Sequence, residues 1–261
     1  MRPGAALVTG GAKRIGRALA LDLAAAGWAV AVHYNTSREA ADATVAEVRA
    51  TGAAAAAVGA DLLDHAAVDA LVGRAAEALG RPLTLLVNNA SIFEHDTLAT
   101  ATRAGWDRHV DSNLWAPVAL TRDFAAQAPE PEIDALGRPV AAACVVNMID
   151  QRVWKPTPEF MTYGVAKAGL WAFTRMAAQA LAPKVRVNGI GPGPSLQGPR
   201  QTPEHFARQQ SAVPLQRGAD PSELAAALRF ILSAGAMTGQ MIALDGGQHL
   251  AWRTPDVLGV E

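Results

Sequence analysis

Short apolar runs alternate with longer segments of helical periodicity along the whole chain. Seven runs have strand length, and most are continuously apolar, which is typical of strands covered on both faces by helices. They are Ala5–Thr9, Ala29–His33, Ala53–Gly59, Leu83–Asn88, Val140–Asn147, Val185–Ile190 and Met241–Leu244. The helical segments are Ile15–Ala26, Ser37–Thr51, Ala66–Leu79, Trp106–Gln127, Thr162–Leu181 and Ser222–Leu232. This alternation predicts an α/β fold with one doubly wound, seven-stranded parallel sheet.

Two proline-rich stretches, Pro129–Pro139 and Gly191–Pro203, interrupt the alternation. The second stretch follows the carboxyl end of a predicted strand, which is the edge at which open α/β sheets bind ligands. No repeat or linker divides the chain. We therefore expect residues 1–261 to form a single domain with a substrate loop near 191–212.

Composition excludes several classes of protein. With 50% hydrophobic and 18% charged residues among 261, the chain can bury one large core. A net charge of -1, from 23 basic and 24 acidic residues, provides no field for nucleic acid or an anionic membrane. The lone Cys144 and six scattered His show no metal-ligand spacing, so we expect no metal and a reducing compartment. Without a signal peptide or a long apolar run, the sequence predicts a cytoplasmic protein.

The turn after the first predicted strand reads Thr9-Gly10-Gly11-Ala12-Lys13-Arg14-Ile15-Gly16. Its small residues let a pyrophosphate approach the backbone, where the N–H groups of the following helix face the phosphates. Gly-rich turns also occur without a nucleotide, but the strand–turn–helix context favours a Rossmann-type dinucleotide site. Its candidate cofactor-binding residues are Gly10, Arg14, Ile15 and Gly16.

The second predicted strand ends without the acidic residue that usually holds the ribose 2′-hydroxyl of NAD. The sequence there is His33-Tyr34-Asn35-Thr36-Ser37-Arg38. Uncharged and cationic donors suit a 2′-phosphate, and this favours NADP(H) over NAD(H). The candidate residues are His33, Asn35, Thr36 and Ser37. Arg38 fits either this cluster or a solvated helix surface.

Tyr163 and Lys167 lie four residues apart in a predicted helix and therefore share one of its faces. A nearby ammonium favours the phenolate. Together with an oxidised nicotinamide, it brings the phenol pKa down from roughly 10 toward neutral pH. A tyrosine in a helix often only packs, but this helix starts at the sheet edge that carries the glycine turn. Tyr163 is therefore a candidate acid–base residue.

In their order along the chain, these motifs resemble the short-chain dehydrogenase/reductase family from Ala5 to Gly247. Thr9–Gly16 matches the glycine motif of the family, and Tyr163-Gly164-Val165-Ala166-Lys167 matches its Tyr-x-x-x-Lys motif. Asn88-Asn89-Ala90 and Asp245-Gly246-Gly247 match two further motifs. A coincidental fit of several motifs in the family's order is implausible.

The resemblance implies roles for residues that no local pattern identifies. Asp61 matches the acid that contacts adenine, with Leu62 beside it, and Pro192-Gly193 matches the turn that meets nicotinamide. Asn113 matches the helix asparagine that supports Lys167 through a water, and Lys167 would also bind the ribose hydroxyls. The further cofactor contacts that the resemblance implies are Asn89, Ala90, Tyr163, Lys167 and Ser195. Ser195 suits an ordinary turn equally well.

Two positions depart from the commonest pattern of the family. Arg14 replaces the middle glycine of the first motif, and Asp150 stands thirteen residues before Tyr163, where the family usually has a catalytic serine. An ionised carboxylate there would repel the oxyanion that develops during reduction of a ketone. A carboxyl group could instead help to protonate the C=N bond of a nitrogen heterocycle. The alternative for Asp150 is a loop cap in an enzyme that has lost its serine.

These departures resemble the pteridine reductase branch of the family, which includes dihydromonapterin reductase. In that branch an aromatic residue matching Phe93 stacks on the pterin, although Phe93 could also be an ordinary buried residue. The implied substrate-binding residues are Arg14, Ser91, Phe93, Asp150 and Tyr163. The implied catalytic residues are Asp150, Tyr163, Lys167 and Asn113.

The sequence therefore predicts an NADPH-dependent reductase of dihydromonapterin, dihydrobiopterin or dihydrofolate, which transfers hydride to a ring carbon. One alternative is a carbonyl or 3-oxoacyl reductase that tolerates Asp150. Another is a nucleotide-binding regulatory protein without catalysis. The resemblance further implies a homotetramer joined through the helices around Trp106–Gln127 and Thr162–Leu181. Trp115, Trp154 and Trp171 could line the pocket, an interface or the core.

Overall fold

A computed structural model describes residues 1–198 and 200–252. Its seven parallel strands form one sheet in the order β3-β2-β1-β4-β7-β8-β9, which confirms the predicted sheet and the α/β class. The strands are β1 Ala5–Val8, β2 Ala29–Tyr34, β3 Ala55–Gly59, β4 Leu85–Asn88, β7 Ala143–Met148, β8 Val185–Pro192 and β9 Met241–Leu244. The order reverses between β1 and β4, and such a switch point opens a ligand crevice at the carboxyl ends of the strands.

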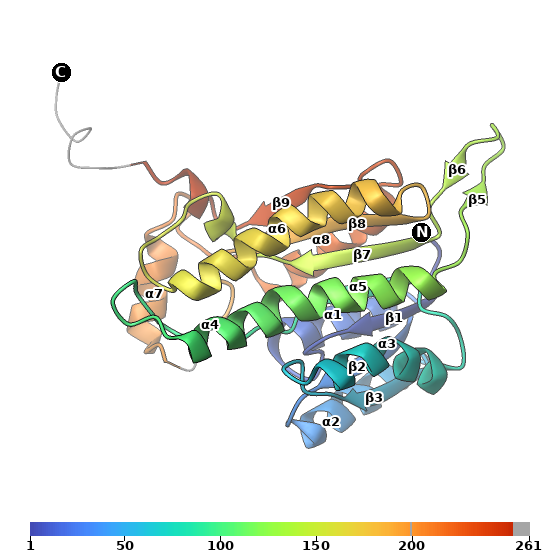
Figure 1. Cartoon of the computed structure of the whole chain (residues 1–261), viewed down its shortest axis with the longest axis horizontal. Helices are drawn as coiled ribbons and strands as arrows, with labels where there is room; N and C mark the ends of the chain where they lie inside the picture. The colour runs from blue at the N-terminus through green and yellow to red at the C-terminus, as the bar shows by residue number, and fades with distance from the viewer. Residues whose placement is uncertain (199, 253–261) are drawn as a thin grey trace.

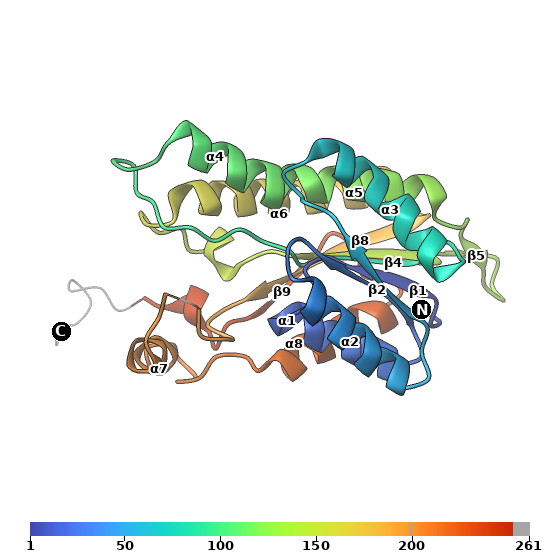
Figure 2. The same cartoon turned by 90° about the horizontal axis from the view of Figure 1, so that it is seen from below.

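Helices cover both faces of the sheet (Figures 1 and 2). One face carries α1 Arg14–Ala25, α2 Arg38–Ala50 and α8 Pro221–Ser233. The other carries α3 His65–Leu79, α5 Ala116–Gln127 and α6 Met161–Leu181, with α4 Arg103–Val110 leading into α5. No helix within the described residues has both the length and the apolar composition needed to cross a membrane.

The continuous apolar runs follow from this two-sided burial. Successive strand residues point to opposite faces, so a strand covered on both faces needs apolar residues at every position. In β1, Ala6 and Val8 pack in the core beneath α1, α2 and α8, whereas Ala5 and Leu7 pack beneath α3, α5 and α6. All four residues are fully buried.

The structure corrects the prediction of one strand over Val140–Asn147. Val140 belongs to a separate antiparallel hairpin of β5 Glu132–Ile133 and β6 Pro139–Val140, and β7 begins only at Ala143. The Asp134 side chain accepts hydrogen bonds from the backbone N–H groups of Leu136 and Arg138, which closes the hairpin turn. The prediction was wrong because an apolar run by itself does not show where the chain changes direction.

Part of the predicted substrate loop is helical. Helix α7 spans Pro203–Ser211, and the Thr202 hydroxyl caps it by accepting a hydrogen bond from the N–H of His205. Pro203 is therefore the first residue of a helix rather than the end of an irregular loop, because proline is well suited to that position. Figure 2 shows α7 beside the carboxyl edge of the sheet.

The predicted helix Trp106–Gln127 forms within a longer helical run that starts at Arg103 and changes its winding. Between α4 and α5, residues Asp111–Trp115 form a π-helical segment. Such insertions are frequent at functional sites because they redirect individual side chains. Here the segment contains Asn113, which is fully buried.

Candidate functional site

Two adjoining cavities lie at the switch point of the sheet. The first has a volume of about 540 Å³ and is lined by the glycine turn, the end of β2, Asp61 and the segment after β4. The second has a volume of about 440 Å³ and is lined by Asp150, Tyr163, Phe93 and the segment after β8. Both are lined by Arg14, Ile15 and Ser91, so they form one continuous site. A dinucleotide and a small substrate need such adjoining spaces.

The glycine turn is shaped for close backbone approach. Gly10 has φ +61°, and a Cβ atom on Gly16 would lie only 2.2 Å from the carbonyl oxygen of Gly10. The Asn89 side chain donates to the Thr9 carbonyl oxygen at 2.8 Å, which ties the turn to the end of β4. The open N-terminus of α1 therefore faces the first cavity, where a pyrophosphate would be favoured.

Arg14 has an unusual backbone conformation, with φ +54°. A side chain in this left-handed region costs roughly 1–2 kcal/mol, which explains why glycine is the common residue at this point of the motif. The Arg14 guanidinium donates to the carbonyl oxygens of Gln197 at 2.9 Å and Leu196 at 3.2 Å. Arg14 thus links the glycine turn to the segment that covers the second cavity.

His33 is buried at the bottom of the first cavity, with 1% of its surface exposed. Its Nδ1 accepts the N–H of Gly10 at 3.0 Å, so Nε2 carries the proton and donates to the carbonyl oxygen of Ala60 at 3.1 Å. Burial lowers the pKa of the ring to about 4. His33 is therefore a neutral support of the glycine turn, with no ring nitrogen left for a 2′-phosphate.

This burial predicts a pH dependence of stability. Unfolded His33 binds a proton near pH 6.5, whereas folded His33 binds it only near 4, so falling pH favours the unfolded chain between these values. We expect this group to remove about 3 kcal/mol of unfolding free energy over that range. Denaturant titrations should show a flatter pH profile for His33→Gln, while His205→Gln, an exposed control on α7, keeps the wild-type profile. Parallel profiles for wild type and His33→Gln would contradict this assignment.

Only some of the other residues predicted to contact the adenosine half of the cofactor line the first cavity. Asn35, Asp61 and Leu62 line the first cavity, as do Asn89 and Ala90. Thr36 and Ser37 lie outside this lining, on the turn that leads into α2. The Arg38 guanidinium is bonded to Asp42 at 3.2 Å on the helix surface. The 2′-phosphate contacts of Thr36 and Ser37 thus stay a prediction.

Asp150 and Tyr163 form a direct pair in the second cavity. The Tyr163 hydroxyl donates to Oδ2 of Asp150 at 2.8 Å, and Oδ1 accepts the N–H of Arg152 at 2.8 Å. Oδ1 thus caps the turn after β7, which is the loop-cap role considered as the alternative for Asp150, while Oδ2 holds the Tyr163 hydroxyl. Burial raises the pKa of Asp150.

The structure corrects the expectation that Tyr163 is held near its phenolate form. Burial and the adjacent Asp150 carboxylate raise the pKa of Tyr163 well above its ordinary value. Lys167 lies with its ammonium 5.7 Å from the Tyr163 ring centroid and donates to the carbonyl oxygen of Met148 at 2.8 Å. Burial lowers the pKa of Lys167 to about 8. Tyr163 is therefore a neutral phenol that is ready to donate a proton.

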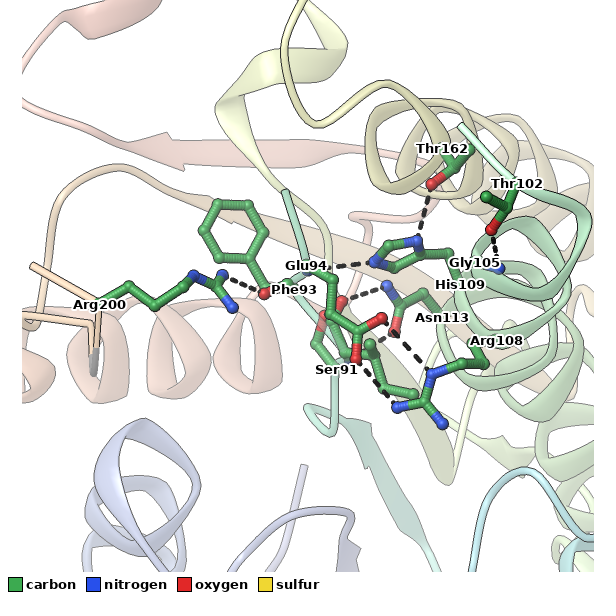
Figure 3. Close-up of polar contacts among 11 residues, drawn as sticks. Ser91, Phe93, Glu94, Thr102, Gly105, Arg108, His109, Asn113, Thr162 and Arg200 are labelled. Carbon is green, nitrogen blue, oxygen red and sulfur yellow. Dashed lines mark hydrogen bonds and ion pairs between the residues drawn. The ribbon is translucent and has the colours of Figure 1, made fainter. Parts of the chain in front are cut away.

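Asn113 is used differently from the expected support of Lys167. Its side chain donates to the carbonyl oxygen of Ile92 at 2.7 Å and accepts the N–H of the same residue at 2.8 Å (Figure 3). Both ends of the amide are thereby engaged by the segment after β4. The water-mediated link from Asn113 to Lys167 stays a prediction.

An aromatic surface forms one wall of the second cavity. Phe93 stacks on Phe160 with ring centroids 4.3 Å apart and contacts the Tyr163 ring edge-on at 4.7 Å. Phe93 is 41% exposed, so it is not the ordinary buried residue of the alternative. Ser195, Pro192 and Gly193 line the same cavity, as does Ser91.

Several residues in or beside the two cavities escaped the sequence analysis, and one of them, Phe160, stacks on Phe93 without belonging to the lining itself. Phe160 and Arg152 flank Asp150 and Tyr163 closely in sequence, so their neighbourhood could have pointed to them. Arg152 lies with its guanidinium 5.0 Å from the centroid of the Phe160 ring. Arg200 and Phe206 come from the segment that the sequence left irregular, and only the fold brings them to the cavity. Lys13 and Arg108 were missed in the first cavity.

The described residues contain no group of three or more His, Cys, Asp or Glu side chains that could hold a metal ion. The ring of Trp154 contacts that of His249, with the two centroids 5.0 Å apart. Trp115, the last residue of the π-helical segment, is 41% exposed, and Trp171 contacts the Arg175 guanidinium on α6. None of these three tryptophans belongs to the lining of the two cavities.

Comparisons with known proteins agree with this geometry. A family model described as Enoyl-(Acyl carrier protein) reductase matches residues 10–249. The 3-oxoacyl-[acyl-carrier-protein] reductase of Synechocystis sp. is 33% identical over 246 residues, which cover 93% of this chain and 95% of the relative.

Two solved structures are more similar in sequence. FolM alternative dihydrofolate reductase 1 from Brucella canis, complexed with NADP, is 44% identical, with a TM-score of 0.88 and 98% of both chains covered. The protein of the same name from Brucella suis, also in complex with NADP, is 46% identical, with a TM-score of 0.89 and 97% of both chains covered. The chain belongs to the short-chain dehydrogenase/reductase family.

Proposed function

We propose that this protein is an NADPH-dependent reductase of a dihydropterin such as dihydromonapterin, dihydrobiopterin or dihydrofolate. The observation that carries the proposal is the hydrogen bond from Tyr163 to Asp150, at 2.8 Å, beside the exposed ring of Phe93. A carboxyl–phenol pair can supply a proton to a basic ring nitrogen. The similar Brucella proteins bind NADP and are named dihydrofolate reductases, which supports both the cofactor and the substrate class.

NADPH would lie along the two cavities and supply the hydride. The backbone around Gly10 and Gly16 fits its pyrophosphate, because only glycine leaves room there. Asn35 at the end of β2 lies where the 2′-phosphate would be held, and Asp61 and Leu62 lie where adenine would bind. Lys167 would bind the ribose of the nicotinamide half through its buried ammonium.

On the substrate side, Phe93 would stack on the pterin ring, and Arg14 would donate to its carbonyl or to a phosphate. Tyr163 would donate the proton, because its phenol is kept protonated, while Asp150 orients the hydroxyl and shares the proton. A proton from solvent would then return Tyr163 to its phenol form. Ser91 and Ser195, which both line the second cavity, would also contact the ligands.

A 3-oxoacyl reductase is the second candidate, since relatives at about one-third identity carry that name. The Asp150 carboxylate disfavours it, because a negative charge beside Tyr163 would repel an oxyanion formed from a ketone. The intact Tyr163–Lys167 pair disfavours a regulatory protein without catalysis.

The proposal includes a single-domain cytoplasmic enzyme that assembles as a homotetramer. Helices α4 and α6 and the π-helical segment expose large apolar side chains, namely Trp106, Trp115, Val165 and Met176. Such residues are enriched at subunit interfaces.

An assay of NADPH oxidation by the purified protein tests the function. We expect turnover with dihydromonapterin, dihydrobiopterin or dihydrofolate, little turnover with simple ketones or a 3-oxoacyl thioester, and weaker activity with NADH. Efficient reduction of ketones together with no activity on any dihydropterin would sink the proposal.

A further inference from the structure

The segment Ser91–Asp96 begins at the junction of the two cavities, and it is held by side chains of a neighbouring helical run. Ser91 and Ile92 line the first cavity, whereas Ser91 and Phe93 line the second. Residues 91–97 have no helix or strand of their own to fix them. Figure 3 shows the Phe93 ring on the side of Arg200, with Arg108, His109 and Asn113 on the other side of the segment. Asn113 binds the backbone of Ile92, which precedes Phe93. His109 and Arg108 bind the backbone and the carboxylate of Glu94, which follows it.

His109 makes the contact closest to Phe93 on this side. Its Nε2 accepts the backbone N–H of Glu94 at 3.2 Å, one residue after Phe93. The Glu94 carboxylate is held separately by Arg108 at 2.9 Å. Because Nε2 is an acceptor, the proton of a neutral His109 lies on Nδ1. His109 is 1% exposed, and burial lowers its pKa, so the neutral form is the stable one.

The hydrogen bonds continue from Nδ1 of His109 to α6, the helix that carries Tyr163. Nδ1 donates to the Thr162 hydroxyl at 2.7 Å, and that hydroxyl donates to the Asp96 carboxylate. Asp96 is 8% exposed and also accepts the backbone N–H of Thr162 at 3.3 Å. Thr162 directly precedes Tyr163, and Phe93 directly precedes Glu94. One directed set of hydrogen bonds, from Glu94 through His109 and Thr162 to Asp96, therefore connects the neighbours of the two main site residues.

We propose that His109 and Thr162 are positioning residues for the substrate: they lock the Phe93 ring at a fixed distance from the Tyr163 hydroxyl, so that a stacked pterin presents its ring nitrogen to that hydroxyl. The proposal rests on the proposed function. Neither His109 nor Thr162 belongs to the lining of the two cavities. Their effect reaches the pterin through Phe93, and the first cavity keeps its own supports in Thr9, His33 and Asn89.

The donor and acceptor roles in this set of hydrogen bonds are fixed at both of its ends. The Glu94 N–H can only donate and the Asp96 carboxylate can only accept, so His109 accepts at Nε2 and donates at Nδ1, and the Thr162 hydroxyl accepts from His109 and donates to Asp96. Removing the Thr162 hydroxyl leaves the Nδ1 proton of His109 buried without its acceptor, which is unfavourable. The segment relieves this cost by shifting, and Phe93 shifts with it.

The test compares Thr162→Val with Thr162→Ser and with a matched control. Thr162→Val keeps the shape and removes the hydroxyl, and it should raise the dihydropterin KM about three- to tenfold, up to the effect of Phe93→Ala itself. The KM for NADPH should stay unchanged, and Thr162→Ser should restore the wild-type KM. The control is Thr121→Val, a buried threonine on α5 whose hydroxyl has no partner within the described residues, and it should leave both KM values unchanged.

A double-mutant cycle separates positioning from general damage. In a Phe93→Ala background, Thr162→Val should raise the dihydropterin KM no further, because the stacked ring that it misplaces is already gone. His109→Asn is the second variant if Thr162→Val does not fold, with the same expected pattern. Additive effects in the cycle, an equal rise in the KM for NADPH, or an unchanged dihydropterin KM in both variants would overturn the proposal. Wild-type protein that reduces no dihydropterin would instead defeat the proposed function itself.

Discussion

Tyr163→Phe should lower the turnover of a dihydropterin by roughly 10²–10⁴ while NADPH binding stays close to that of the wild type. The substitution removes the only hydroxyl of a side chain whose ring is otherwise held by packing against Phe93 and burial in α6. Because burial and the Asp150 carboxylate raise the pKa of Tyr163, the loss is that of a proton donor rather than of a phenolate base. Single-turnover oxidation of NADPH and a separate cofactor titration measure the two quantities.

The matched control for this variant is Tyr34→Phe, at the other tyrosine of the chain, which lies at the end of β2. It should keep the wild-type turnover. Full activity of Tyr163→Phe on a good substrate would reject the assigned role, and a parallel loss of NADPH binding would indicate a damaged cofactor site instead.

Asp150→Ser should lower dihydropterin turnover by about 10²-fold or more, within the range for removal of one acid–base group. The carboxyl group holds the Tyr163 hydroxyl at 2.8 Å, and serine is too short to replace both of its oxygens. With the negative charge gone, some reduction of ketones should appear. Parallel assays of dihydropterins and ketones measure this exchange of specificity.

The same site offers a direct electrostatic check. Burial and the Asp150 carboxylate both raise the pKa of Tyr163, so Asp150→Asn should lower that pKa by removing the second of these causes. The chain has two tyrosines, and a Tyr34→Phe background leaves Tyr163 as the only phenol to titrate by ultraviolet difference absorption. An unchanged midpoint, or a dihydropterin turnover of Asp150→Ser equal to that of wild type, would contradict the role of the carboxyl group.

Much of the architecture could be predicted from local patterns. The strand–helix alternation identified all seven strands of the sheet, because burial on both faces requires long apolar runs. The two errors occurred at proline-rich stretches, where hairpin β5–β6 and helix α7 formed instead of a strand extension and a loop. Turn and cap hydrogen bonds of Asp134 and Thr202 decided these two cases, and their geometry is not visible in periodicity.

Much of the site followed from the sequence as well, since Tyr163, Lys167 and Asp150 lie on or next to a single helix and strand end. The roles of other residues did not follow. His33 has the residue type of a phosphate ligand, but its burial and its bond to Gly10 make it a neutral support. Asn113 similarly binds the backbone of Ile92.

By itself, the sequence determined which residues could be brought together: the order of strands and helices, the glycine turn, and the tyrosine–lysine pair on one helical face. These properties depend on backbone sterics and on helical and strand periodicity, which act over a few residues. Only the tertiary structure decided the protonation of Tyr163, the neutral state of His33 and the chain from Glu94 to Asp96. Burial and long-range hydrogen bonds determine such states, because the free energy of a charge depends on every group that surrounds it in the folded protein.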